Sequence, residues 1–245
     1  MLPVVRRISD HTFLANLVGK QGALVVDLGM NSGAFSRDVL KLRADPIVYG
    51  CEPVPSLHER LFREFGARAL NCAIGGKTED SQITIYDHFC PSVVLRSLED
   101  NAKTIPVRIV AFDELIARLA LDHIDLLKVD IEGSELAMLQ NSSAASLQKC
   151  DQITVEFHDF IDPTHLPAIH ACIARLESLG FVMFRCSISS YSDVLFIHKR
   201  RLGFGDAVVI RIAIFLKNLN LLKARNFARR LIGVTGRGVP ALKRQ

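Results

Sequence analysis

The chain has 245 residues, of which 49% are hydrophobic and 23% charged, and its net charge is +4. This length and composition suit one large α/β domain with a full core and argue against disorder. The six cysteines are never closer than 14 residues, which excludes a CxxC or zinc-ligand spacing. We interpret them as reduced thiols of a cytoplasmic protein. Polar residues interrupt the segment 8–17, so we expect no signal peptide.

The segment VVDLGMNSGAFS, residues 25–36, predicts a buried strand, a glycine-containing turn and a helix. Nucleotide-like cofactors bind at such turns in α/β proteins. Of the dinucleotide fingerprint GxGxxG only Gly29 remains, because Asn31 and Ala34 occupy the other glycine positions. S-adenosylmethionine carries no phosphate, and its cationic amino and sulfonium groups favour an acid at the strand end. The residues that we assign to this cofactor are Asp27, Gly29, Asn31 and Gly33.

A second acid supports a nucleoside ligand. The run 47–52 predicts the next strand, and its last residue, Glu52, follows Gly33 by 19 residues. A carboxylate about 20 residues beyond such a turn binds a ribose. NAD and S-adenosylmethionine proteins share this offset, so only Asp27 and the missing glycines separate the two cofactors.

The rest of the chain alternates between helix and strand patterns. The expected helices cover 35–42, 55–65, 113–121 and 166–179, and the expected strands cover 24–27, 47–52, 67–73, 124–129, 152–157, 181–186 and 194–198. Two more apolar runs, 81–86 and 105–110, enclose a polar loop that we place over the cofactor. Seven strands with intervening helices predict a doubly wound sheet.

A second charged strand end follows the run 124–129. Asp130 and Glu132 come directly after it, and His158 follows the next predicted strand. Methyl transfer needs an aligned acceptor oxygen and a base that takes its proton. We favour Asp130 as the base and Glu132 as a group that orients the substrate. His158 is the rival base, because a neutral imidazole accepts a proton at cytosolic pH.

Two other interpretations of these acids stay open. Lys128, Asp130, Glu132 and Glu135 could form an ion-pair cluster that caps the following helix, which for Glu135 is the favoured interpretation. Asp130 and Glu132 could instead bind a divalent metal through their oxygens. Two acids in one turn are thin support for a metal, so we assign none.

Five motifs occur together between Gly22 and His198: VVDLGMNSGAFS, CEPVP, NCAIGG, LLKVDIEGSELAML and VEFHD. In this order they resemble the FkbM family of S-adenosylmethionine-dependent methyltransferases, whose usual turn is GxNxG. The resemblance implies a Rossmann-like class I methyltransferase fold, with a seven-stranded, mostly parallel sheet whose last strand is antiparallel. It adds Ala73 of NCAIGG to the cofactor-binding residues. It also implies O-methylation of a sugar, a glycan precursor or a small metabolite.

We divide the chain into a lead-in over 1–21, a methyltransferase domain over 22–198 and a basic tail over 199–245. The tail holds twelve Lys or Arg against one acid, a net charge of +11, which leaves −7 for the rest. Its apolar run 207–216 is shorter than the roughly 20 residues needed to cross a bilayer.

We expect the tail to be helical, but its charges scatter around a helix and define no clear amphipathic face. It is expected to pack on the domain or on a protein partner, or to lie on an anionic membrane at its inner face. Few aromatic residues interleave with the charges, which disfavours nucleic acid as a partner.

Two classes of function remain, an enzyme and a binding protein. The first is a methyltransferase, and the second is a noncatalytic nucleoside-binding or scaffold protein with the same fold. A nucleotide-dependent oxidoreductase is a weaker alternative, because the turn lacks two of its glycines. The acceptor cannot be read from spacing, since loops such as 87–103 and the segment after His158 shape its pocket.

Overall fold

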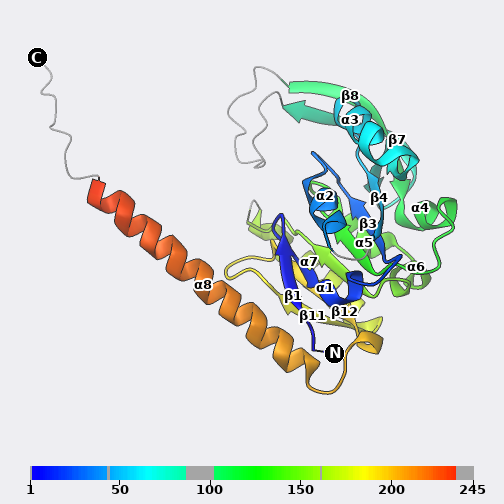
Figure 1. Cartoon of the computed structure of the whole chain (residues 1–245). Coiled ribbons are helices and arrows are strands. Elements are labelled where there is room, and N and C mark those ends of the chain that lie inside the picture. Colours follow the sequence, from blue (N-terminus) through cyan, green and yellow to red (C-terminus); the bar gives the residue numbers. More distant parts are fainter. Residues whose placement is uncertain (1, 43–44, 87–101, 161, 236–245) are drawn as a thin grey trace, which may run out of the picture.

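The computed structural model describes residues 2–42, 45–86, 102–160 and 162–235 (Figure 1). Its centre is a seven-stranded sheet in the order β11-β12-β10-β9-β3-β4-β5. These strands are β3 (Leu24–Leu28), β4 (Ile47–Cys51), β5 (Ala69–Leu70), β9 (Leu126–Val129), β10 (Gln152–Val155), β11 (Phe181–Arg185) and β12 (Val194–His198). The last of them, β12, runs antiparallel to both of its neighbours. The expected α/β class I methyltransferase sheet is confirmed.

Helices cover both faces of this sheet, because successive strand residues point to opposite sides. On one face, Val26, Leu127 and Ile153 form the main core with helices α4 to α7. On the other face, Val25 and Leu126 pack against α1 and α2. The helices are α1 (Ala15–Val18), α2 (Ala34–Leu40), α3 (Pro55–Phe65), α4 (Phe112–Arg118), α5 (Glu135–Asn141), α6 (Ala144–Gln148) and α7 (Leu166–Ser178). Asp27 comes two residues after Val25, and Lys128 two residues after Leu126, so both charged side chains point to the second face.

An N-terminal hairpin also packs on the second face. It consists of β1 (Val5–Ile8) and β2 (His11–Leu14), joined by a turn in which Ser9 and Asp10 have φ of 43° and 66°. The side chain of Gln152 bonds both the backbone N–H and the carbonyl of Leu14, at 2.7 and 3.2 Å. The residues expected as a lead-in are thus part of the packed structure.

The run expected as one strand over 67–73 forms two short strands in different sheets. Residues Ala69–Leu70 join the central sheet as β5, whereas β6 (Ala73–Gly75) pairs with β8 (Ala102–Ala111), which also pairs with β7 (Glu79–Tyr86). Between them Asn71 turns away, and its side chain donates to the Glu52 carbonyl at 2.9 Å. Residues 87–101 of the expected cofactor loop lie outside the described part of the chain.

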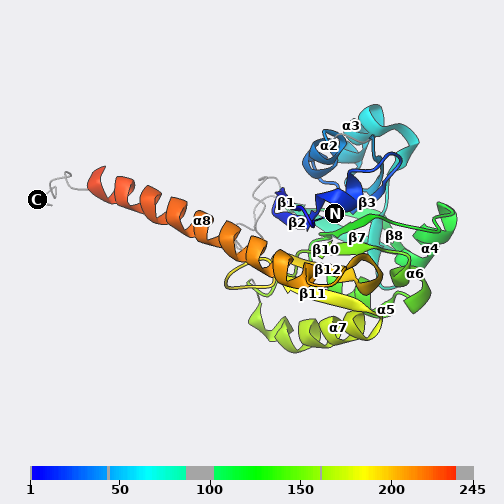
Figure 2. The same cartoon turned by 60° about the horizontal axis from the view of Figure 1, so that its bottom comes forward.

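The tail forms the helix α8 (Asp206–Thr235), which leaves the domain as a long rod in both views (Figures 1 and 2). Near its start Ile210 and Ile214 are buried against Leu195 and Ile197. Exposed apolar residues, Val208, Ile212, Phe215 and Leu216, line the outer side of the same turns, so apolar side chains lie on both sides of the helix there. Within the described residues, no helix combines the length and the apolar character needed to cross a membrane.

We expect Gly29→Ala to destabilise the protein far more than Gly22→Ala. Gly29 has φ of +83°, and a Cβ there would lie 1.8 Å from the carbonyl oxygen of Asp130, whereas at Gly22, with φ of +69°, it would meet nothing within 4 Å. Gly22→Ala therefore adds only left-handed strain of about 1–2 kcal/mol. Urea unfolding measures the difference, and equal losses would contradict a packing role for Gly29.

Candidate functional site

A buried ammonium, that of Lys128, lies at the centre of the site. Lys128 stands opposite Asp27 in the parallel register of β9 and β3, and its side chain is 4% exposed. Its Nζ lies 3.1 Å from Asp27 Oδ1 and 3.3 Å from Asp130 Oδ2, and donates to the Gly29 carbonyl at 2.5 Å. Burial lowers the pKa of Lys128, but the two carboxylates outweigh it and raise the pKa above its ordinary value. Lys128 therefore stays charged and ties the two strand ends together.

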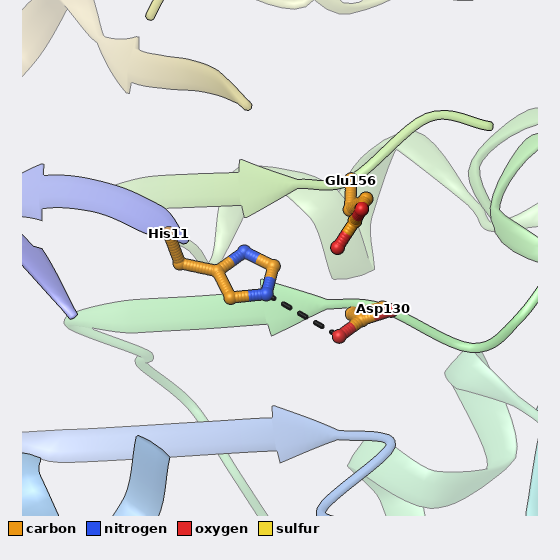
Figure 3. A group of neighbouring side chains, drawn as sticks. All are labelled: His11, Asp130 and Glu156. Carbon is orange, nitrogen blue, oxygen red and sulfur yellow. Dashed lines mark hydrogen bonds and ion pairs between the residues drawn. The ribbon is translucent and has the colours of Figure 1, made fainter. Parts of the chain in front are cut away.

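His11, Asp130 and Glu156 converge beside this ammonium (Figure 3). They come from β2 and from the ends of β9 and β10, and one ligand atom of each lies within 4.8 Å of the others. His11 is 1% exposed, and its Nε2 lies 3.4 Å from Asp130 Oδ2. Among the described residues, nothing forms a hydrogen bond or an ion pair with the Glu156 carboxyl. Glu156 is therefore the carboxyl of this group that is unpaired among the described residues.

The pKa values of the two carboxyls in this cluster are shifted in opposite directions. Burial favours the neutral acid at Asp130, but His11 and Lys128 overcome it and hold the pKa of Asp130 well below its usual range. Burial and the nearby Asp130 charge raise the pKa of Glu156 to about 7. Asp130 is thus a fixed anion, whereas Glu156 exchanges a proton near neutral pH.

The predicted cofactor turn follows β3 and borders a hollow of about 370 Å³, which we call the turn pocket. Gly29, Asn31 and Phe35 line it on one side, and Asp130 and Glu132 on another. The turn is held by hydrogen bonds from the Gly29 and Met30 amides to the Cys51 carbonyl, at 3.1 and 2.9 Å. Gly29, Asn31, Asp130 and Glu132 are therefore brought to one pocket.

Asp27 does not line the turn pocket. Its carboxylate is fully buried, accepts from Ser36 Oγ at 2.6 Å and pairs with Lys128. Its sequence-based role as a cofactor ligand stays a prediction. The structure shows it holding the start of α2 and the Lys128 ammonium.

Glu52 lies behind the turn and is 4% exposed. Its Oε2 accepts from the Asn31 amide at 2.7 Å and its Oε1 from the Val54 amide at 2.9 Å. Burial raises its pKa, and these amides offset the effect only in part. Each oxygen retains a lone pair for a further donor, so binding of a ribose stays a prediction.

Gly33 and Ala73 also lie outside the lining of the turn pocket. At Gly33, with φ of +81°, an added Cβ would lie 2.6 Å from Leu61 Cδ2, so this glycine permits the close packing of α3. Ala73 is half-buried at the start of β6. Their assignment to the cofactor stays a prediction.

His158 contacts two acids that follow β9. Its Nε2 lies 3.5 Å from Glu132 Oε2 and its Nδ1 3.5 Å from Glu135 Oε1. Burial lowers the pKa of His158, but the two acids outweigh this and raise it to about 10. His158 is therefore protonated at neutral pH and holds no free lone pair for a substrate proton. Glu135 accepts from the Ile131 and Gly133 amides, which agrees with its expected capping role.

The donor set also bears on the metal alternative for Asp130 and Glu132. Within the described residues Asp130 belongs to two groups that could present ligand atoms to an ion, one with His11 and Glu156 and one with Glu135 and His158. The Lys128 ammonium, however, already lies 3.3 Å from the Asp130 carboxylate. A divalent cation on the same carboxylate would be repelled by that charge.

Residues 27–183 match the model of the methyltransferase FkbM domain. This range is 157 of the 245 residues. The chain belongs to the FkbM methyltransferase family. S-adenosylmethionine is therefore its cofactor, as the turn and the two acids predicted.

Three curated relatives show the same similarity at low identity. The chain is 24% identical to the 31-O-demethyl-FK506 methyltransferase FkbM of Streptomyces tacrolimicus over 71% of this chain and 79% of that one. It is 26% identical to the methyltransferase sdnD of Sordaria araneosa over 72% and 80%. The AMB antimetabolite synthetase AmbE of Pseudomonas aeruginosa is 25% identical over 65% of this chain, which spans only 9% of that larger protein.

Solved structures are more distantly similar. Fibrillarin of Aeropyrum pernix with bound S-adenosyl-L-methionine gives a TM-score of 0.40 at 14% identity, covering 73% of this chain and 66% of that one. The precorrin-6y C5,15-methyltransferase of Geobacter metallireducens gives 0.38 at 11% identity, covering 76% and 88%. The family assignment stands on the match of the sequence to the FkbM domain.

The described residues fit this cofactor. The turn pocket joins the acids Asp130 and Glu132, which suit a ligand with cationic groups, to an apolar side formed by Phe35. The exposed side chain of Asn31 adds polar donors and an acceptor. S-adenosylmethionine carries no phosphate, so the turn does not need the phosphate cradle that a full GxGxxG pattern forms.

Two functional side chains, His11 and Glu156, escape prediction from motifs alone, whereas Lys128 belongs to the ion-pair cluster that the sequence left open and does pair with Asp130. Lys128 is visible in the sequence as a charge inside an apolar strand, and its burial follows from that position. Glu156 could have been found from its place directly after β10 beside Asp130. His11 carries no such signal, because 119 residues separate it from Asp130 in the sequence.

We expect Lys128→Met to destabilise the protein by about 3–5 kcal/mol, because it leaves the buried Asp27 and Asp130 carboxylates without their counter-charge. Adding Asp27→Asn should restore part of that loss, since one unpaired charge is then removed. Lys41→Met is the matched control: its exposed pair with Asp38 is worth less than about 1 kcal/mol. Urea unfolding at neutral pH measures all three. A Lys128→Met protein as stable as the control would show that the ion pairs are not structural.

Proposed function

We propose that the protein transfers a methyl group to a hydroxyl oxygen of a sugar, a glycan precursor or another small metabolite. The observation that carries this proposal is the Glu156 carboxyl, unpaired among the described residues, which borders His11 and Asp130 beside the turn pocket. The Streptomyces relative supports it, because that protein is named as a methyltransferase for an O-demethyl compound. An oxygen acceptor, unlike an unprotonated amine, needs a base to take its proton.

Bound S-adenosylmethionine supplies an activated methyl group and leaves as S-adenosylhomocysteine. The acids that line the turn pocket, Glu132 and the fixed anion Asp130, would hold the cationic cofactor. Glu156 accepts the hydroxyl proton of the acceptor, and its pKa of about 7 suits that role at neutral pH. Lys128 and His11 keep Asp130 ionised. This proposal moves the base from Asp130, the residue favoured from the sequence, to Glu156.

A noncatalytic nucleoside-binding protein with this fold is the alternative. Such a protein would keep the turn pocket but would need no group that titrates near neutrality. Glu156 would then be a half-buried carboxyl, unpaired among the described residues, without a benefit to offset the stability that burying an unpaired charge costs. That cost is the reason for preferring the enzyme.

The first test needs no known acceptor. Because burial raises the pKa of Glu156 above its unfolded value, its ionisation destabilises the folded state as pH rises from about 4.5 to about 7. Glu156→Gln should therefore unfold at the wild-type temperature near pH 4 and at a higher temperature near pH 8. Glu177→Gln, an exposed acid on α7, is the matched control and should change neither value.

The second test is activity. Wild-type protein should bind S-adenosylhomocysteine in calorimetry and transfer labelled methyl groups to hydroxyl compounds, with a rate that rises through pH 7 as Glu156 ionises. Glu156→Gln should lower that rate about 10²- to 10⁴-fold without loss of cofactor binding. Cofactor binding with no transfer to any hydroxyl compound would favour the noncatalytic alternative. A rate that falls with Asp130→Asn but not with Glu156→Gln would return the base to Asp130.

We further propose that α8 lies on an anionic membrane surface on the cytoplasmic side. Val208, Ile212, Phe215 and Leu216 are each more than half exposed, at the spacing of one helical stripe. Ile210 and Ile214 on the opposite side are buried against the domain. The tail carries a net charge of +11, which complements an anionic surface. An apolar stripe in a basic helix is the usual pattern of an interfacial helix.

Vesicle co-sedimentation tests this placement with the full chain. Wild type should pellet with phosphatidylcholine vesicles that contain phosphatidylglycerol, and less so at high salt, because salt screens the basic residues. The double change Ile212→Ser and Phe215→Ser should abolish pelleting, whereas Leu40→Ser and Phe62→Ser, two exposed apolar residues elsewhere, should not. If light scattering shows instead that the α8 stripe pairs two copies of the chain, the membrane proposal is wrong.

A further inference from the structure

A second hollow, of about 610 Å³, lies between the N-terminal hairpin and α8. We call it the hairpin hollow; Arg7, Ser9, Lys217, Asn218 and Asn220 lie among its lining residues. Its volume falls in the range of small-molecule sites, about 300–1,000 Å³. Polar groups from two separate elements therefore converge on a space that the cofactor turn does not border.

The hairpin hollow adjoins the turn pocket. Ser9 lines both of them, so the two spaces meet at the turn of the hairpin. The next residue along β2 is His11, which contacts Asp130 and belongs to the cluster with Glu156. Asp10, which lines the hollow, is also near enough to Glu156 for its charge to raise the pKa of that carboxyl, so a molecule in the hairpin hollow lies near the proposed base.

The cations of this hollow differ in how they are paired. Arg7 contacts Asp10 at 3.1 Å and the buried Asp193 at 3.2 Å, so its charge is compensated. Lys217 donates to the Val5 carbonyl at 2.7 Å, and no described carboxylate lies within ion-pair distance of its Nζ. An ammonium makes three hydrogen bonds, so two donors of Lys217 are available to a ligand.

The surroundings of Lys217 also favour a ligand of opposite charge. Burial lowers its pKa, and the charges of Arg6 and Arg7 act in the same direction, whereas Cys186 and Asp193 oppose this without reversing it. Asn218 uses one amide hydrogen on the Cys186 carbonyl at 3.0 Å and keeps its oxygen and its other hydrogen. The hollow thus offers one cation that has no ion-pair partner among the described residues, together with neutral donors and acceptors, while its acid Asp10 is largely exposed and pairs with Arg7.

We propose that the hairpin hollow holds the methyl acceptor, and that this acceptor carries an anionic group, phosphate or carboxylate, which binds the Lys217 ammonium. This inference rests on the proposed O-methylation. The neutral amides of Asn218 and Asn220 bind hydroxyl groups of the acceptor. The hydroxyl that reacts lies past Ser9, toward Glu156. In this arrangement the tail helix forms a wall of the acceptor site.

Binding of inorganic phosphate to the full chain tests the anion site. Amide signals of Ser9, Asn218 and Asn220 should shift in NMR spectra as phosphate is added. Lys217→Met should weaken this binding about tenfold to a hundredfold, the effect of losing one hydrogen bond to a charged group. Arg211→Met removes a charge from the same helix outside the hollow and should leave binding unchanged. Absent shifts, or equal binding by Lys217→Met, would overturn the anion site.

Methyl transfer tests the acceptor role. With labelled S-adenosylmethionine, wild type should accept hydroxyl compounds that carry phosphate or carboxylate and reject their neutral analogues. Lys217→Met should raise KM for these acceptors with little change in kcat, because Lys217 holds the acceptor and not the reacting oxygen. Methyl transfer to phosphatidylglycerol vesicles would identify a lipid headgroup as the acceptor, whereas transfer only to soluble compounds would identify a free metabolite. Equal transfer to neutral and anionic compounds would overturn the inference.

Calorimetry with S-adenosylhomocysteine separates this failure from that of the proposed function. If wild type binds the cofactor product and methylates neutral hydroxyl compounds, only the acceptor class is wrong. If it binds the product and transfers to no hydroxyl compound, the proposed function fails. Lys217→Met should bind the product as wild type does, since Lys217 does not border the turn pocket.

Discussion

The buried Lys128 ammonium is the interaction on which the site depends. It lies between Asp27 of β3 and Asp130 after β9, and it donates to the Gly29 carbonyl of the cofactor turn. One charge therefore sets the position of the turn and the ionisation of an acid in the turn pocket. Because Lys128 and Asp27 are shielded from water, their attraction is stronger than that of a surface pair. Removing Lys128 would leave both carboxylates without their counter-charge.

This pairing frees a different acid for chemistry. Lys128 and His11 keep Asp130 ionised, so Asp130 contributes a constant negative charge. Among the described residues, no group forms a hydrogen bond or an ion pair with the Glu156 carboxyl, and burial raises its pKa. Two neighbouring carboxyls with separated proton affinities can divide the work of binding a cation and of moving a proton.

Much of the fold follows from local patterns in the sequence, but the pairing of charges does not. The apolar runs and the DLGMNSG turn predict β3, β4 and α2 closely, because burial alone determines them. The sequence places Asp27 at a strand end but not opposite Lys128, since that depends on the register of two strands about 100 residues apart. His11 reaches Asp130 only because the hairpin folds back over β10, which no local pattern predicts.

Helix α8 has an inner and an outer side with different surroundings. The inner side borders the hairpin hollow through Lys217, and the outer side exposes the stripe of Val208, Ile212, Phe215 and Leu216. Any contact that holds the helix against the hairpin stabilises the shape of that hollow. If the outer contact strengthens the binding of a molecule in the hollow by some factor, that molecule strengthens the outer contact by the same factor, because thermodynamic linkage is reciprocal. The affinity of α8 for the surface that it contacts would then depend on whether the hollow is occupied.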